Sequence, residues 1–307
     1  MDNDVKAYKS YADQVQILED RGMDMGDRES AAEILKRLNY YRLSGYWYPF
    51  RKLSGGKRLD EFFPGTRFCD VVKLYEFDAR LRAATFAALA PIELAVRALI
   101  GHELGRIDPC IHHMPSLLGP QARVGDKYSK WLDRYQLEVE HSREEFVRHH
   151  VERYESRLPV WVAVEVLDWG SLTQLYSFAP RRTQDVVAKT CHLSAPQLGS
   201  WLKALNLVRN VCAHHGRFFN RVHAITPKLP PPSGQERADL DAVRTSWDRT
   251  FGQLTLIQYL MGKLEVGNPR LLPAVLKSFP GNRVVPVTHT GAPANWERDC
   301  GPLWRSD

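Results

Sequence analysis

The sequence lacks the features that mark several common classes of protein. No run in its 307 residues comes close to 18 consecutive apolar residues, which argues against a membrane span. The first residues, MDNDVKAYKSY, are polar and contain no apolar signal region. The five cysteines are widely spaced and form no CxxC pair, which argues against a disulfide scaffold or a zinc ribbon. We therefore expect a cytoplasmic protein with reduced thiols.

Motifs for cofactor and metal chemistry are also missing. The sequence contains no GxxxxGK[ST], GxGxxG or GxSxG pattern, so it predicts no nucleotide cofactor and no serine hydrolase. Histidine pairs occur at 112–113 and 149–150, and Cys212 lies three residues before His215, but no second ligand pair accompanies them. Cys212 as a nucleophile would lack a visible oxyanion-binding group. We predict neither a metal nor a cofactor.

Acidic residues are absent from two long windows. Residues 36–58 contain seven Lys or Arg, and residues 186–235 contain six Lys or Arg and four His, without one Asp or Glu. Together the two windows carry a charge of +13. Because the net charge of the whole chain is +6, the rest of the chain carries −7. Such segregation indicates a surface for an anionic partner, although solvated loop charge would give the same count.

The hydrophobic pattern predicts a mostly helical protein. Helical spacing of apolar residues, with caps and breakers, predicts helices over 27–43, 69–105, 127–157, 160–167, 171–178, 194–214, 236–263 and 271–278. Because Pro91 lies inside the second of these, we expect a kink or break near Ala90. A turn-rich segment with a short strand is expected around 46–56, and a proline-rich linker at 227–234. Trp296 and Trp304 would either fix the tail to the body or leave it loose.

Residues 205–221, LNLVRNVCAHHGRFFNR, contain the densest group of chemically capable side chains. Arg209, Asn210, His214 and His215 fall within seven residues at the end of the predicted helix over 194–214. Arginine stays charged and binds phosphate through a planar fork, and histidine exchanges protons near neutral pH. Together they can cleave RNA without a metal, by attack of the ribose 2′-hydroxyl on the adjacent phosphorus.

The helical spacing limits how these groups can cooperate. Arg209 and His214 are five residues apart, or about 140° around a helix with 3.6 residues per turn. A shared phosphate would need the helix to end there, or two copies of the segment to meet. The alternative is a helix end that carries favourable cations and has no catalytic role.

Motifs distributed along the whole chain resemble those of a known family. Arg209 to His214 matches the R-x4-H motif of HEPN ribonucleases, and the chain as a whole resembles the Abi-like proteins of the AbiD/AbiF type, which are bacterial abortive-infection factors. Nearly the whole chain shows the resemblance, in Asp13-Gln14 with Leu18 and Arg21-Gly22, Leu38–Tyr46 with Pro49–Arg51, Leu74–Asp78 with Arg80–Arg82, Ile92-Glu93 with Arg97, Arg209–Arg217 with Asn220-Arg221, and the tail Asn295-Trp296 with Pro302–Trp304.

The resemblance implies an all-α, HEPN-like helical bundle with metal-independent endoribonuclease activity and a role in phage defence or as a toxin. His214 would be the catalytic histidine, with Arg209 and Asn210 as its partners, and two copies would pair their motifs. Acidic residues at matching positions of the long helix, Glu76, Asp78 and Glu93, would either orient this pair or form ordinary ion pairs.

RNA is the partner that these observations predict, and the resemblance implies a small structured noncoding RNA as one form that it could take. The expected contacts are the basic and polar residues after His214 and the basic–aromatic window, namely His215, Arg217, Asn220, Arg221, Arg42, Tyr46, Arg51 and Lys52. Packing of these aromatic residues in the core is the alternative. We expect an N-terminal segment 1–60, a helical domain 61–265 and a tail 266–307. A non-catalytic RNA-holding protein and a protein-interaction domain are the competing functions.

Overall fold

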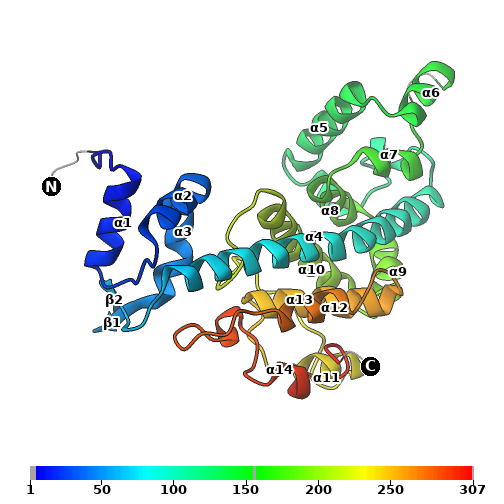
Figure 1. Ribbon diagram of the computed structural model, residues 1–307. Helices are drawn as coiled ribbons and strands as arrows, with labels where there is room; N and C mark the ends of the chain where they lie inside the picture. The colour runs from blue at the N-terminus through cyan, green and yellow to red at the C-terminus, as the bar shows by residue number, and fades with distance from the viewer. Residues whose placement is uncertain (1–4, 155–156, 306–307) are drawn as a thin grey trace.

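The computed structural model describes residues 5–154 and 157–305. It is 61% helical with fourteen α-helices and one two-stranded sheet in this part, which confirms the predicted all-α fold (Figure 1). The elements are α1 (Tyr11–Asp20), α2 (Arg28–Leu38), α3 (Tyr40–Trp47), η1 (Tyr48–Phe50), β1 (Arg51–Ser54), β2 (Lys57–Phe62), α4 (Phe68–Gly105), η2 (Ile111–His113), η3 (Pro120–Arg123), α5 (Lys127–His141), α6 (Glu145–Arg153), α7 (Val160–Val166), α8 (Trp169–Phe178), α9 (Arg181–Thr190), α10 (Ala195–Ala213), α11 (Gln235–Asp241), α12 (Thr250–Leu264), α13 (Leu271–Lys277), η4 (Val287–Thr290) and α14 (Trp296–Asp299).

Helix α4 crosses the whole molecule and organises the rest. Helices α1–α3 and the β1–β2 hairpin lie at one end of α4, and α5–α8 lie at the other (Figure 1). Along its length α4 packs against α3, α10, α12, α13 and α7. By length and composition alone it is the one helix in the described residues that could cross a membrane, and 44% of its most apolar window is buried inside the fold. It continues through Pro91, where we expected a kink or break, without interruption.

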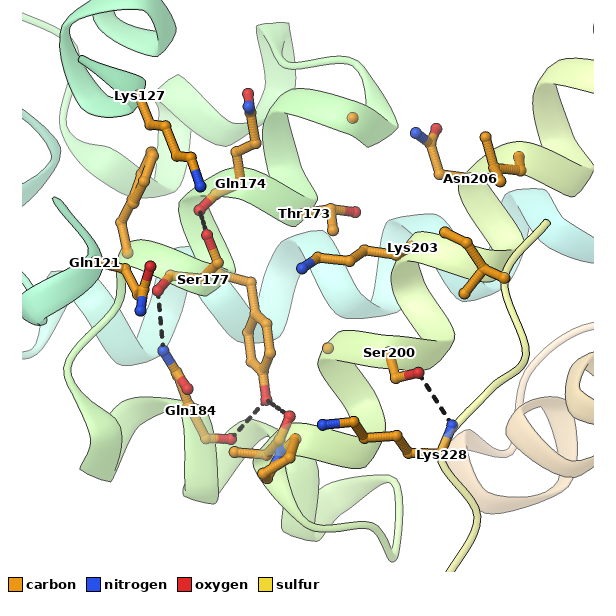
Figure 2. A pocket seen from close by; sticks show the side chains of 18 of the residues that line it. Gln121, Lys127, Thr173, Gln174, Ser177, Gln184, Ser200, Lys203, Asn206 and Lys228 are labelled. Carbon is orange, nitrogen blue, oxygen red and sulfur yellow. Dashed lines mark hydrogen bonds between the residues drawn. The ribbon is translucent and has the colours of Figure 1, made fainter. Parts of the chain in front are cut away.

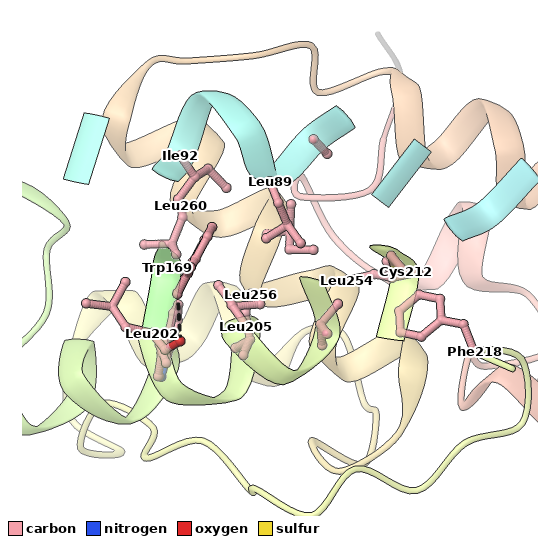
Figure 3. Packing of buried hydrophobic residues seen from close by; sticks show 14 of the residues in the cluster. Leu89, Ile92, Trp169, Leu202, Leu205, Cys212, Phe218, Leu254, Leu256 and Leu260 are labelled. Carbon is pink, nitrogen blue, oxygen red and sulfur yellow. Dashed lines mark hydrogen bonds between the residues drawn. The ribbon is translucent and has the colours of Figure 1, made fainter. Parts of the chain in front are cut away.

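A layer of apolar side chains between α4, α10 and α12 fixes the position of α10. Leu89 and Ile92 of α4 face Leu205 of α10 and Leu256 of α12 (Figure 3), and each of these residues is at most 1% exposed. The indole Nε1 of Trp169 donates to a backbone carbonyl of α10 at 3.0 Å. Full burial of each such side chain contributes about 1.5–3 kcal/mol, so this layer determines where the polar end of α10 emerges.

The structure divides three of the predicted helices. The expected helix over 27–43 is two helices, because Asn39 adopts a φ of +63° and its Oδ1 accepts from the backbone N–H of Tyr41 at 2.8 Å, starting α3 anew. The charged helix predicted over 127–157 breaks between α5 and α6, and the helix predicted over 236–263 breaks between α11 and α12. A Cβ on Gly252 would lie 2.5 Å from the backbone oxygen of Ser246, so glycine permits the chain before α12 to fold back. Helices α1, α9 and α14 were not predicted.

Two local predictions near the site and at the tail are supported by contacts. The Oε1 of Gln197 accepts from the backbone N–H of Ser194 at 2.7 Å, at the predicted start of α10. In the tail, Trp304 is 1% exposed, stacks on Phe251 with ring centroids 4.4 Å apart, and donates its Nε1 to Thr255 Oγ1 at 3.1 Å. The tryptophan therefore fixes the tail to α12.

Candidate active site

Helix α10 ends in a tight turn that determines where the two histidines lie. The backbone N–H of Gly216 donates to Val211 O at 2.9 Å, and that of His215 donates to Cys212 O at 3.2 Å. These two bonds form a Schellman motif, in which the residue after the cap is left-handed. That residue is His215, with φ +55°, and Gly216 follows it. We expected Gly216 to stop the helix, but the left-handed position is one residue earlier.

This turn exposes both imidazoles but gives them different surroundings. His214 is the C-cap residue, and its backbone N–H still donates to Asn210 O at 3.0 Å, so its side chain follows directly from the last helical turn. The backbone carbonyl of His215 accepts from Arg42 Nη1 at 2.9 Å, which ties the turn to α3. No hydrogen bond to either ring is found within the described residues, so both rings are available to a ligand.

A cleft of about 670 Å³ lies between α3 and the end of α10, and we call it the histidine cleft. Its walls contain five of the residues singled out from the sequence, namely His214, His215, Arg42, Arg217 and Tyr46. None of the Asp or Glu residues that the structure describes lines it, and its remaining lining residues are Asn39, Tyr41, Ser44, Gly45 and Gly216. A histidine beside two arginines without a carboxylate is an environment that suits a phosphodiester.

Arg209 lies outside this cleft. Its guanidinium is centred 5.5 Å from the ring of Phe86 on α4, and its Nη1 donates to Asn210 Oδ1 at 3.4 Å. Its Nε is buried and has no partner in the described part of the chain. Arg209 and His214, expected to act together, therefore face different surroundings within one chain, as the 140° spacing indicated.

A buried carboxylate, Asp78 of α4, holds the segment that follows the histidines. Its two oxygens accept from the backbone N–H groups of Phe218, at 3.0 Å, and Phe219, at 2.6 Å. Oδ2 also accepts from Tyr46 Oη and from Arg82 Nη1, each at 2.6 Å. Burial raises the pKa of Asp78, and the four donors oppose that shift by stabilising the ionised form.

Asp78 thus joins α3, α4 and the chain after α10 at one point. The sequence indicated Asp78 only as an acidic position that would orient Arg209 or His214 or form an ion pair. It contacts neither of those two residues and pairs with Arg82 instead. Of the other two carboxylates, Glu93 pairs with Arg97 at 2.6 Å, and Glu76 is exposed.

The residues after the histidines are mostly engaged within the protein. The Arg217 side chain packs on Gly45, where an added Cβ would lie 3.1 Å from its Cδ, and partial burial lowers its pKa. The Oδ1 of Asn220 accepts from Arg249 at 2.6 Å. Arg221 Nη1 donates to the Arg217 carbonyl at 3.2 Å. These contacts position the wall of the histidine cleft and leave Arg217 as its half-buried cation.

The basic–aromatic window at 36–58 is only partly available to a ligand. Tyr46, which we expected to contact RNA, is 1% exposed, and its hydroxyl is bound to Asp78, so its ring cannot stack on a base. Arg51 pairs with Asp60 at 3.2 Å on the hairpin. Lys52 is half-exposed, and Arg42 is exposed beside His215. Arg42 and the buried Tyr46 both line the histidine cleft, and of the four residues only Arg42 presents an exposed side chain there.

The cysteine and histidine residues considered from the sequence as a nucleophile or as metal ligands lie in surroundings that do not suit these roles. Burial raises the pKa of Cys212 to about 12, so the thiol stays protonated and is a poor nucleophile. His112 is buried against His113 and Tyr135, and burial lowers its pKa to about 3. Among the described residues no group of three or more His, Cys, Asp or Glu is placed to hold a metal ion.

Comparison with known proteins identifies the family to which the chain belongs. No curated protein and no solved structure matches the chain. The family model of the Abi-like proteins matches residues 33–220, which is more than half of the chain and includes α3, α4 and α10. This family suggests a role in abortive-infection defence against phage. The matched segment contains every wall of the histidine cleft, and the chain belongs to the Abi-like protein family.

Proposed function

We propose that the protein is a metal-independent endoribonuclease of the HEPN type that acts in phage defence or as a toxin. The observation that supports this most directly is the exposed imidazole of His214 in a cleft with Arg42 and Arg217 and without a carboxylate. A phosphodiester held by these arginines would lie beside an imidazole, the side chain that most often transfers protons in catalysis.

The reaction requires no external reagent other than the RNA. The ribose 2′-oxygen forms a bond to the adjacent phosphorus, and the bond from phosphorus to the 5′-oxygen of the next nucleotide breaks. The 2′-hydroxyl loses its proton, the leaving 5′-oxygen gains one, and the products end in a 2′,3′-cyclic phosphate and a 5′-hydroxyl. In this proposal His214 transfers a proton and an arginine stabilises the charge on the phosphoryl oxygens.

Arg209 enters this scheme through a second copy of the chain. It lies beside an exposed face of α4 that is apolar over more than three turns, formed by Ala83, Phe86, Ala87, Ala90 and Leu94. A continuous apolar helix face is typical of a surface that another chain covers. We propose that two copies meet on this face, so that Arg209 of one copy approaches the histidine cleft of the other.

Sedimentation velocity tests the pairing. We expect the wild type to sediment as a dimer and Leu94→Glu, at a residue 59% exposed, to sediment as a monomer because a charge in an apolar interface is unfavourable. Leu137→Glu on α5 is the matched control, since Leu137 is 52% exposed and lies on another helix, and it should remain a dimer. A monomeric wild type at all accessible concentrations contradicts the pairing.

A 2′-deoxy substitution tests the proposed chemistry. We expect purified protein to cut a labelled RNA oligonucleotide in excess EDTA, and to lose cleavage at any nucleotide whose 2′-hydroxyl is replaced by hydrogen. The products should carry the cyclic phosphate. Cleavage of the all-deoxy strand, or its loss in EDTA and return with added divalent metal, would be incompatible with this mechanism. An RNA that is bound and left intact favours the second candidate, a protein that holds a small structured RNA.

A further inference from the structure

A second cleft, of about 840 Å³, lies on the other side of α10 from the layer in Figure 3 and is open to solvent. Helix α8, α10 as far as Leu207 and the segment around Lys228 form its walls, and the start of α5 closes one side (Figure 2). We call it the lysine cleft. Lys127, Lys203 and Lys228 extend into it from three separate segments, and Figure 2 shows their ammonium groups directed toward the same space.

The charge of the lysine cleft is not compensated. No Asp or Glu is among its lining residues, and none of the three lysines forms an ion pair within the described part of the chain. The fourth cation, Arg134, is paired with Asp168 at 2.5 Å. Three unpaired ammonium groups around one cavity favour an anion, because each repels the others until a negative charge lies between them.

Hydrogen-bonding groups accompany these cations. Thr173, Gln174 and Ser177 line the wall made by α8, and Ser200 and Asn206 line the wall made by α10. Ser200 also accepts from the backbone N–H of Lys228 at 3.0 Å, which fixes the segment that carries this lysine. Hydroxyl and amide groups interleaved with lysines suit the phosphate oxygens and ribose hydroxyls of a nucleic acid backbone.

A row of polar side chains on α10 leads from the lysine cleft toward the candidate active site. Lys203, Asn206, Asn210 and His214 follow one another at intervals of three, four and four residues, which places them on one side of the helix. From Lys203 to His214 the helix rises about 16 Å at 1.5 Å per residue. This face carries no acidic residue, since the window 186–235 contains none.

We propose that the lysine cleft binds the backbone of the single-stranded RNA whose cleaved bond lies at His214. This proposal rests on the proposed function for the position of cleavage, while the binding of RNA in the cleft can be measured without it. The cleft would hold several phosphates of the strand, and the polar face of α10 would guide the strand to the histidine cleft. Lys127, Lys203 and Lys228 are binding residues here and take no part in the chemistry.

Binding of a fluorescent single-stranded RNA, measured by anisotropy at 50–200 mM salt, tests this proposal. The background is His214→Ala, in which we expect cleavage to be too slow to affect the binding measurement. We expect Lys203→Ala combined with Lys228→Ala to weaken binding and to make the slope of log affinity against log salt less negative by about 0.7 per lysine, or about 1.4 in all. Lys189→Ala, at an exposed lysine on neighbouring α9 outside the cleft, is the control and should leave the slope unchanged.

The outcomes separate the two proposals. If the double variant binds RNA like the control variant, the lysine cleft is not the RNA site, whether or not the wild type cuts RNA. If the double variant loses binding and the wild type leaves RNA intact, the cleft proposal holds for binding and the catalytic proposal fails. Competition by ATP at concentrations equal to those of the RNA would overturn the assignment to an RNA strand and favour a free nucleotide.

Discussion

His214→Ala is expected to lower the rate of RNA cleavage by about 10²–10⁴-fold, the usual contribution of a positioned proton-transfer group. The imidazole lies at the C-cap of α10 in the histidine cleft, exposed and without an internal partner in the described residues. Its removal should leave the fold intact because the cap bond to Asn210 comes from the backbone. Single-turnover cleavage of a labelled RNA, followed on a gel, measures the effect.

His215→Gly is the matched control for this loss. His215 has a φ of +55°, which glycine adopts without strain, and its known contact is the backbone carbonyl that accepts from Arg42. The substitution therefore removes an adjacent imidazole while preserving the Schellman turn. We expect the rate of cleavage to stay within about tenfold of the wild type, a smaller loss than removal of a proton-transfer group causes. Equal losses in both variants, or none in His214→Ala, would remove His214 from the proposed role.

Asp78→Ala is expected to cost about 3–5 kcal/mol of unfolding free energy, the usual effect of removing one partner of a buried ion pair. Arg82, which is 5% exposed, would be left charged without its carboxylate. The backbone N–H groups of Phe218 and Phe219 would lose their acceptor as well. Urea unfolding followed by circular dichroism measures the change.

Glu76→Ala is the control, because Glu76 lies two residues earlier on the same helix and is exposed. We expect it to change stability by less than about 0.5 kcal/mol. A loss below about 1 kcal/mol in Asp78→Ala, well under the range for a broken buried pair, would show that Asp78 does not hold the segment after α10. Because that segment forms a wall of the histidine cleft, RNA cleavage should fall in Asp78→Ala even where the variant remains folded.

Local signals in the sequence were enough to place α10 and its histidines. Ser194, Pro196 and Gln197 mark the start of the helix, and the predicted end near His214 agrees with the structure. The turn itself was less predictable. Glycine is the usual left-handed residue after a helix, so Gly216 was the natural choice, while hydrogen bonds to Val211 and Cys212 place His215 in that position.

Features that depend on distant contacts could not be predicted from the sequence. Asp78 binds backbone N–H groups 140 residues away, and a backbone group leaves no signature in a sequence. Tyr46 was expected to contact RNA because it lies among arginines, but its hydroxyl reaches Asp78 and its ring is buried. The lysine cleft likewise combines Lys127 with Lys203 and Lys228, and only folding brings these positions together.

The contact between Tyr46 and Asp78 has a consequence for shortened forms of the protein. Helix α3 supplies both this hydroxyl and the Arg42 guanidinium that holds the turn at His215. A fragment that begins after the hairpin would keep α4 and α10 but lose one wall of the histidine cleft and one of the four donors to the buried carboxylate. The smallest fragment that retains the candidate active site therefore begins before α3, and Asn39, which caps that helix, has to be part of it.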